Sequence, residues 1–194
     1  MDSREKILKA IEANLPPQQI LPEVEAINAI SFEDKAAAFT KTTEGIGSKL
    51  IAVNSYDDIT RYINENYSND VKILTTITDL SAFTQLDATG APALLNDTML
   101  AIIPAKMGVA ENGAVWVTDA IFKIRALPFI CENLAVVLHR KDIVSNMHQA
   151  YAAIGETEYA FGLFIAGPSK TADIEQSLVL GAHGPKTMTI FLMD

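Results

Sequence analysis

Three consecutive segments early in the chain constrain the fold more than any others. Lys49–Val53 and Val71–Thr75 have the length and apolar character of buried strands. Between them, Ser55 and Asp58 form a hydroxyl-x-x-acid helix start, and the apolar residues that follow recur at helical spacing. Strand, helix and strand in this order make a βαβ unit, which requires a parallel sheet and a right-handed crossover. These segments therefore predict an α/β fold.

Later apolar runs predict the other strands. They lie at Met99–Ile103, Leu134–Leu138, Tyr159–Ala166 and Thr187–Leu192. Asn112-Gly113, which stands between two short apolar runs, is a dipeptide that favours a tight hairpin. Ser31 is expected to cap one helix, and Asp142–Ile154 has the apolar spacing of another. We expect an open, mostly parallel sheet with flanking helices.

The N-terminal part of the chain differs from the rest. Ser3–Asn14 places its apolar side chains at helical spacing and reads as an amphipathic helix. Gln18–Ile30 is apolar without any period, so we interpret it as an extended arm over the body or over a partner subunit. The sequence thus predicts an N-terminal helix and extended arm at residues 1–30 and a single α/β domain at residues 31–194.

The charge balance limits the partners that this chain can bind. Fifteen Lys and Arg residues stand against 24 Asp and Glu residues, which gives a net charge of −9 and a pI near 4.8. Nucleic acid and anionic membrane surfaces require basic patches, so we expect neither as a partner. The charged N-terminal segment is unlike a signal peptide, and no apolar run approaches the length of a membrane span. The expected compartment is the cytoplasm.

The chain has one cysteine, Cys131, in an apolar setting without a neighbouring base. A single cysteine excludes a disulfide within the chain and an iron–sulfur cluster held by the chain's own thiolates. We expect Cys131 to be buried and inert. His139 and His148 lack metal-binding spacing, so no metal site and no intrinsic cofactor are predicted.

The loop from Gly167 to Asp173 is the first candidate site, because it is strongly polar and directly follows an apolar run. Gly167 allows the backbone to approach a ligand, and Ser169, Lys170 and Thr171 can donate to phosphate or carboxylate oxygens. A helix starting near Thr171 would add free N–H groups. The alternative is an ordinary junction in which these hydroxyls cap a helix and the lysine is solvated.

A carboxylate and an imidazole offer further candidates. Glu111 lies beside the predicted hairpin turn, where desolvation would suit it to act as an acid, base or nucleophile. The alternative is a solvent-facing hairpin residue. His183 and Gly184 belong to a second Gly-Pro turn. We predict that Glu111, His183 and the Gly167–Asp173 loop converge at one end of the sheet and bind a small anion.

Four blocks of sequence resemble the LUD-domain family, the family of lactate-utilisation protein C. They are Val109–Ala114, Arg125–Pro128, Ala166–Glu175 and Gly181–Lys186, in the family's order and spacing. The resemblance extends from about Met99 to the C-terminus. It implies an α/β fold similar to that of the sugar-phosphate isomerase and CoA-transferase group.

The resemblance also implies a function. It points to an accessory subunit that helps to oxidise L-lactate to pyruvate beside partner subunits carrying iron–sulfur clusters. The chain itself would bind a small carboxylate or phosphorylated ligand and hold no redox centre. Glu111-Asn112-Gly113 is also similar to the block that carries the glutamyl nucleophile of CoA-transferases. A stand-alone transferase or isomerase using Glu111, and a non-catalytic ligand-sensing domain, therefore stay open, as does the oligomeric state.

Overall fold

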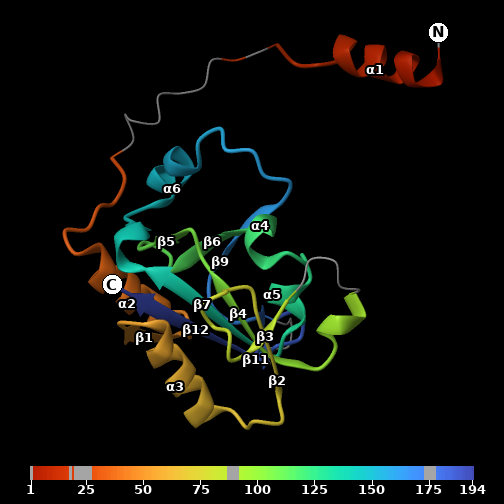
Figure 1. Cartoon of the computed structure of the whole chain (residues 1–194). Helices are drawn as coiled ribbons and strands as arrows, with labels where there is room; N and C mark the ends of the chain where they lie inside the picture. The colour runs from red at the N-terminus through yellow and green to blue at the C-terminus, as the bar shows by residue number, and fades with distance from the viewer. Residues whose placement is uncertain (1, 18, 20–27, 87–91, 173–177) are drawn as a thin grey trace.

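The structure, a computed structural model, describes residues 2–17, 19, 28–86, 92–172 and 178–194. Its centre is a six-stranded sheet in which all neighbouring strands are parallel (Figure 1). In spatial order the strands are β1 (Lys49–Val53), β12 (Thr187–Met193), β7 (Asn133–His139), β4 (Thr98–Pro104), β2 (Lys72–Thr75) and β3 (Thr84–Gln85). The predicted α/β fold with a mostly parallel sheet is confirmed.

The central strands are apolar throughout because both faces of the sheet are covered. In β4, Ala101 and Ile103 face one hydrophobic cluster, whereas Leu100 and Ile102 face another. This alternation is the normal consequence of a strand whose successive side chains point to opposite faces. The predicted βαβ unit has its two strands in this sheet, but β12, β7 and β4 lie between β1 and β2.

A second sheet contains four short strands in the order β8-β5-β6-β9. Their bounds are β8 (Ile143–Val144), β5 (Met107–Val109), β6 (Ala114–Thr118) and β9 (Gly162–Ile165). β5 and β6 form an antiparallel hairpin around the predicted Asn112-Gly113 turn. A separate antiparallel pair consists of β10 (Lys170–Ala172) and β11 (Leu178–Leu180).

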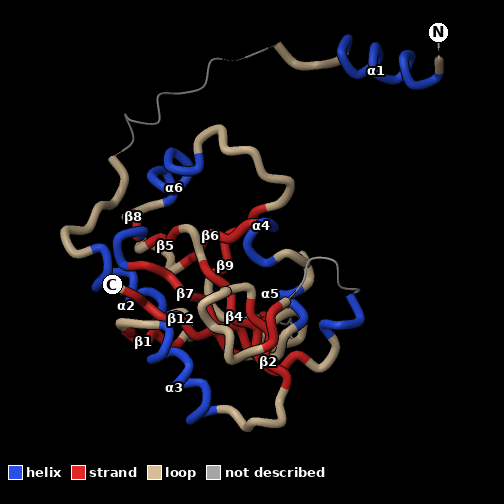
Figure 2. Tube along the Cα trace, in the orientation of Figure 1, coloured by secondary structure: helices blue, strands red, loops and turns tan. Residues whose placement is uncertain are grey.

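The helices complete a layered arrangement (Figure 2). α3 (Tyr56–Asn66) buries Ile59 and Ile63 against one face of the large sheet. The other face meets α2 (Lys35–Gly45), α4 (Asp119–Phe122), α5 (Leu127–Ile130) and the inner face of the second sheet. α6 (Met147–Ile154) covers the outer face of that second sheet. In the described part of the chain, short 3₁₀ helices lie at Pro92–Leu95 and Arg140–Asp142.

Two helix starts differ from the expected positions. The helix expected over Asp142–Ile154 begins only at Met147, because Ile143 is buried in a strand and Asn146 caps the helix by accepting from Gln149 N–H. α2 is capped by Asp34, which accepts from Ala37 N–H, and not by Ser31. In both places, a residue nearer to the helix supplies the oxygen that its free N–H groups need.

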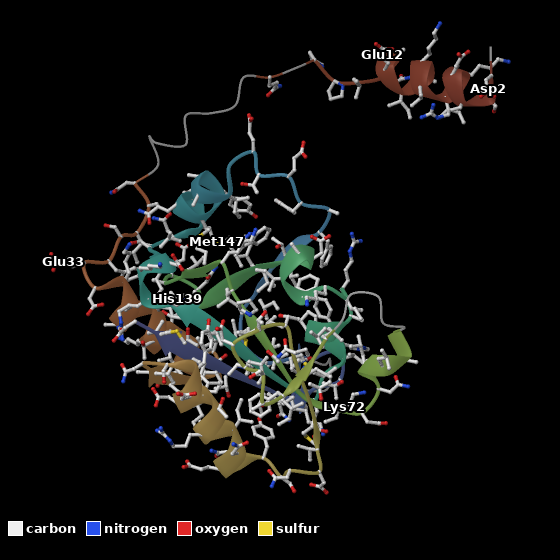
Figure 3. The ribbon with its side chains drawn as sticks, viewed as in Figure 1. Asp2, Glu12, Glu33, Lys72, His139 and Met147 are labelled. Carbon is white, nitrogen blue, oxygen red and sulfur yellow. The ribbon has the colours of Figure 1, made fainter. Side chains whose placement is uncertain are left out.

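The N-terminal helix α1 (Ser3–Ala13) forms as expected and stands apart from the rest of the protein (Figures 1 and 3). Its apolar residues Ile7, Leu8 and Ile11 are exposed. Most of the predicted arm at Gln18–Ile30 lies outside the described residues. Ile30 is described, and its carbonyl accepts a bond from the Asn146 side chain at the start of α6. None of the helices described here is both long enough and apolar enough to cross a membrane.

Candidate functional site

The two Gly-Pro turns of the predicted site lie against each other. Ser169 N–H donates to the carbonyl of Pro185 (2.9 Å), and Gly181 N–H donates to the carbonyl of Ser169 (3.2 Å). A Cβ atom placed on Gly184 would lie 3.2 Å from Ser169 Cβ. Backbone pairing of this kind fixes the two turns as one unit, although they are separated in sequence.

The end of α2 lies between the first Gly-Pro turn and the β5–β6 turn. Gly167 (φ +80°) lies against the carbonyl oxygen of Ile46, and Gly113 (φ +70°) lies against the side chain of Ile46 and the backbone of Thr43. Both glycines have a backbone conformation that other residues rarely adopt. Lys170 Nζ donates to the carbonyl of Ile46, so this cation satisfies the C-terminal end of a helix.

The segment after Lys170 is a strand. Lys170–Ala172 pairs antiparallel with Leu178–Leu180, so the helix start considered near Thr171 does not form and supplies no free N–H groups for an anion. Asp173 lies outside the described residues. A turn that feeds a hairpin uses the same glycine, proline and hydroxyl residues as one that feeds a helix, which is why the pattern did not separate the two.

Glu111 contacts the start of α6. Met147 N–H donates to Glu111 Oε1 (2.7 Å), and Glu111 N–H donates to the carbonyl of Ser145 (3.0 Å). The carboxylate is half-buried. A negative charge beside the first free N–H groups of a helix stabilises the helix. The structure thus gives this carboxylate a partner in α6. Gly113, in the same turn as Glu111, contacts Ile46, and Gly167 contacts Ile46 as well.

A buried polar cluster beside Glu111 was missed by the sequence reading. Ser145 and Asn146 are both 3% exposed. Ser145 N–H donates to the Gln149 side chain (2.8 Å), and Ser145 Oγ accepts from Phe32 N–H (3.2 Å). The cluster joins α6 to the segment that precedes α2. Its signal in the sequence is the cap spacing from Asn146 to Gln149, which falls inside the helix that the apolar spacing predicts over Asp142–Ile154.

His183 and Gly184 line a cavity of about 570 Å³ at the amino ends of β4, β7 and β12. We call it the amino-edge cavity. Its lining includes the acidic Asp97 and Glu132, together with His183 and Lys186, and its apolar part includes Met99, Phe129 and Ile130. Lys186 Nζ and Glu132 Oε1 form an ion pair (2.9 Å). The cavity therefore combines a cation, an imidazole and hydrogen-bond acceptors with an apolar wall.

Cys131 also lines the amino-edge cavity, but it is only 2% exposed. Burial raises the pKa of its thiol to about 12. The thiol is therefore protonated at neutral pH, as expected for a structural cysteine, and a protonated thiol is neither a nucleophile nor a metal ligand.

The other candidate side chains lie apart from one another. Arg125, which begins one of the family-like blocks, pairs with Asp119 (3.5 Å), and its guanidinium lies over the ring of Phe161 (5.2 Å). His139 ends β7, and His148 is exposed on α6. Within the described residues, no three His, Cys, Asp or Glu side chains gather as metal ligands would.

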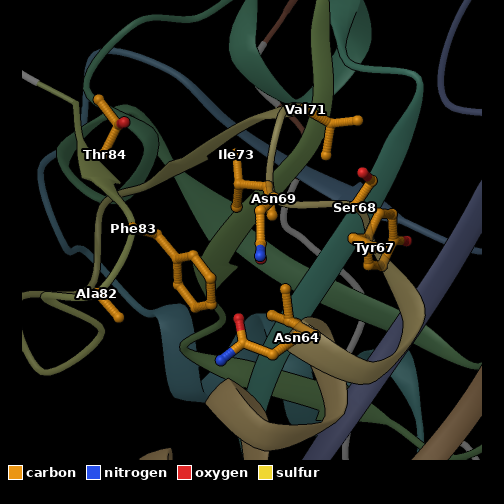
Figure 4. Close-up of a pocket in the computed structure, with 10 residues that line it drawn as sticks. Asn64, Tyr67, Ser68, Asn69, Val71, Ile73, Ala82, Phe83 and Thr84 are labelled. Carbon is orange, nitrogen blue, oxygen red and sulfur yellow. The ribbon is translucent and has the colours of Figure 1, made fainter.

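A smaller cavity of about 210 Å³ lies at the amino end of β2 (Figure 4). Asn64, Tyr67 and Asn69 come to it from the end of α3 and the turn that follows, and Phe83 lies opposite. Burial raises the pKa of the Tyr67 hydroxyl. The described lining of this cavity has amides and hydroxyls but no charged residue, so it is less suited to a carboxylate than the amino-edge cavity is.

The sequence of this chain is similar to those of lactate utilization proteins from several bacteria. Lactate utilization protein C of Geobacillus kaustophilus is 35% identical over 107 residues, which cover 48% of this chain and 45% of that protein. Lactate utilization protein C of Bacillus pumilus is 36% identical over 92 residues, which cover 44% of this chain and 38% of that protein. The chain thus spans less than half of the length of these relatives.

The fold is similar to that of a solved structure. A DUF162 family protein from Deinococcus radiodurans aligns with a TM-score of 0.59 at 13% identity, covering 86% of this chain and 100% of that chain. At this identity the likeness concerns the fold alone. The LUD domain family model matches residues 67–193, which is well over half of the chain. The protein belongs to the LUD-domain family.

Proposed function

We propose that this chain is an accessory subunit of a lactate-utilisation system and that it binds a small hydroxy- or oxo-carboxylate in the amino-edge cavity. The similarity to lactate utilization protein C carries the first part of the proposal. The second part is supported by Gly181–Lys186, one of the blocks that resemble the family, because five of its six residues line the cavity.

The residues of the cavity suit such a ligand. The ion pair between Lys186 and Glu132 is largely exposed, and pairs of this kind contribute less than about 1 kcal/mol. The Lys186 ammonium is thus free to bind a ligand carboxylate at little cost. Glu132 and Asp97 can then accept a hydrogen bond from a 2-hydroxyl group. His183 can donate to, or accept from, the same group.

The proposal assigns the electron transfer to partner subunits. Oxidation of L-lactate to pyruvate releases two electrons and two protons, and the one thiol of this chain is buried and protonated. In our proposal, subunits carrying iron–sulfur clusters accept the electrons while this chain binds and orients the carboxylate. The cytoplasm remains the predicted compartment.

Ligand binding can be tested by thermal shift with L-lactate, pyruvate, sugar phosphates and CoA. A ligand at a hundredfold its Kd adds about 2.7 kcal/mol of stability. We expect L-lactate or pyruvate to stabilise the native protein, and the variants His183→Ala and Lys186→Met to lose that response. Lys141→Met is the matched control, because Lys141 is exposed and does not line the cavity. The absence of any shift from either carboxylate contradicts this part of the proposal.

The accessory role needs its own experiment. A tagged chain expressed in its native host is expected to co-purify with a protein that shows the absorption of an iron–sulfur cluster, and deletion of the gene is expected to abolish growth on lactate. Normal growth of the deletion strain on lactate, together with purification of the chain alone, contradicts the role.

A CoA-transferase-like enzyme that uses Glu111 is the competing proposal. It draws support from the half-buried carboxylate and from the closeness of Gly113 to the end of α2 that Gly167 also contacts. Glu111→Gln removes the charge and keeps the oxygen that accepts from Met147 N–H. Loss of acyl-CoA turnover in a stably folded Glu111→Gln protein favours this enzyme over the accessory role.

A further inference from the structure

A cavity of about 220 Å³ lies on the outer face of the second sheet, between the sheet and the end of α6. Trp116 and Thr118, two residues apart in β6, point to this face, and Met107 is the cross-strand neighbour of Trp116 in β5. Ile154 closes the cavity from α6. We call it the outer-sheet cavity; none of the residues that line it also lines the amino-edge cavity.

Aromatic rings form the wall of the outer-sheet cavity. Trp116 is 6% exposed, and the ring of Tyr159 meets it edge to face with centroids 5.3 Å apart. Phe164 packs on Trp116 as well, at 4.6 Å. A Cβ atom placed on Gly162 would lie 2.5 Å from the Trp116 ring, so the glycine makes room for the ring. The indole is therefore held in place and presents a fixed surface on which a flat molecule can pack.

Two polar side chains beside these rings lack an interaction partner among the described residues. Thr118 stands at the N-cap of α4, yet its hydroxyl makes no capping bond. This hydroxyl is buried and has no hydrogen-bond partner among the described residues, a condition that calls for an explanation in a native protein. Lys106 is exposed at the cavity, and it is the one charged residue among the described lining residues. It forms no ion pair with any other described residue.

We propose that the outer-sheet cavity binds a small aromatic carboxylate. The ring of the ligand packs against Trp116, Met107 and Ile154, and the carboxylate pairs with the Lys106 ammonium. The unused hydroxyl of Thr118 donates to a ligand oxygen. An inorganic anion would leave the apolar wall unfilled, and a hydrocarbon would leave Lys106 and Thr118 without partners, so a molecule with both characters fits best.

Trp116 is the one tryptophan in the sequence, so the tryptophan fluorescence of the protein reports on ligand binding in this cavity. Benzoate, the test ligand, is titrated into the full chain while Trp116 fluorescence is followed. Benzyl alcohol is the neutral comparison, and benzylamine is the cationic one. We expect a saturable change with benzoate, an affinity about tenfold lower for benzyl alcohol, and no saturable change with benzylamine. A charge-assisted hydrogen bond contributes a difference of this size.

Variants assign the binding to named atoms. Lys106→Gln should reduce benzoate affinity about tenfold, to that of benzyl alcohol, while Lys141→Gln leaves it unchanged. Thr118→Val keeps the shape of the side chain and should weaken binding severalfold. Thermal melts of the variants check that each is folded.

Three results overturn this inference: no saturable change with benzoate, equal affinity for benzoate and benzyl alcohol, or undiminished benzoate affinity in a folded Lys106→Gln protein. His183→Ala should leave benzoate affinity unchanged, because His183 lines the other cavity. The result thus stands independently of whether the chain binds lactate.

Discussion

The amino-edge cavity and the outer-sheet cavity are built in different ways. The polar lining of the amino-edge cavity comes mostly from loops, namely the 181–184 turn and the residues directly before β4 and β7, while the end of α5 supplies the apolar Phe129 and Ile130. Strand faces make the outer-sheet cavity, whose wall is the buried side of a hairpin. A cavity made of loops can change its charged residues without disturbing the core, whereas one made of strand faces is part of the packing itself.

The largest expected effect is a difference in the free energy of unfolding between a variant of the outer-sheet cavity and a variant of the amino-edge cavity. Trp116→Ala should lower the free energy of unfolding by about 3–5 kcal/mol, because it removes a buried ring from the small core under α6. His183→Ala, at an exposed position, should change it by less than about 0.5 kcal/mol. Denaturant unfolding followed by circular dichroism measures both. Equal losses in the two variants would remove the distinction.

The thiol at the back of the amino-edge cavity gives a pH test. The pKa of Cys131 is raised from 9.0 to about 12 by burial, so its protonated form belongs to the folded state. Its contribution to stability is therefore fully present below pH 9 and is lost as the pH rises from 9 towards 12. We expect unfolding measurements over this range to show a steeper loss in the native protein than in Cys131→Ala. Parallel curves would mean that the thiol is solvated.

Glu111 lines neither the amino-edge cavity nor the outer-sheet cavity. Its replacement tests whether its carboxylate stabilises the start of α6. Glu111→Ala should destabilise the protein by about 1–2 kcal/mol, because the N–H group of Met147 loses its acceptor at the start of α6. Glu111→Gln should lose less, since the amide oxygen can still accept. Thermal or chemical unfolding provides the comparison. A Glu111→Ala protein as stable as the parent would show that this bond contributes nothing.

A small stability effect is also expected for the second charged variant of the amino-edge cavity. Lys186→Met breaks an exposed ion pair with Glu132, so the free energy of unfolding should fall by less than about 1 kcal/mol. Binding of a small carboxylate should nevertheless weaken markedly. Calorimetric titration with pyruvate, beside an unfolding curve, separates the two quantities. A large loss of stability would place Lys186 in the structural framework instead.

The sequence predicts five of the six strands of the large sheet well because each has a strong local signal, whereas β3, made of the exposed polar residues Thr84 and Gln85, has no such signal and was not predicted. The runs at 99–103 and 134–138 are apolar on both faces and appear in the structure as β4 and β7. The order of the strands and the second sheet were not predicted. Both depend on pairings between distant residues, and Ile143 fits the apolar spacing of a helix as well as a buried position in β8.

The candidate site was predicted unevenly for a similar reason. Gly-Pro turns have a clear signature, and the two turns do meet through Ser169 and Pro185. The partners of Lys170 and Glu111 are backbone groups of Ile46 and Met147. Backbone acceptors and donors carry no residue signature, so no pattern of side chains could have indicated that these two charges meet helix ends.

The position of β12 has a consequence for how the protein is made. Among the described strands, β12 is the single neighbour of β1, and β12 also pairs with β7. A nascent chain that has not yet released Thr187–Met193 from the ribosome therefore holds β1 and one edge of β7 without a neighbour. Such unpaired apolar edges attract other chains, and the large sequence separation slows their closure. The sheet can therefore be completed only after β12 has been synthesised, and until then the unpaired edges of β1 and β7 are open to association with other chains.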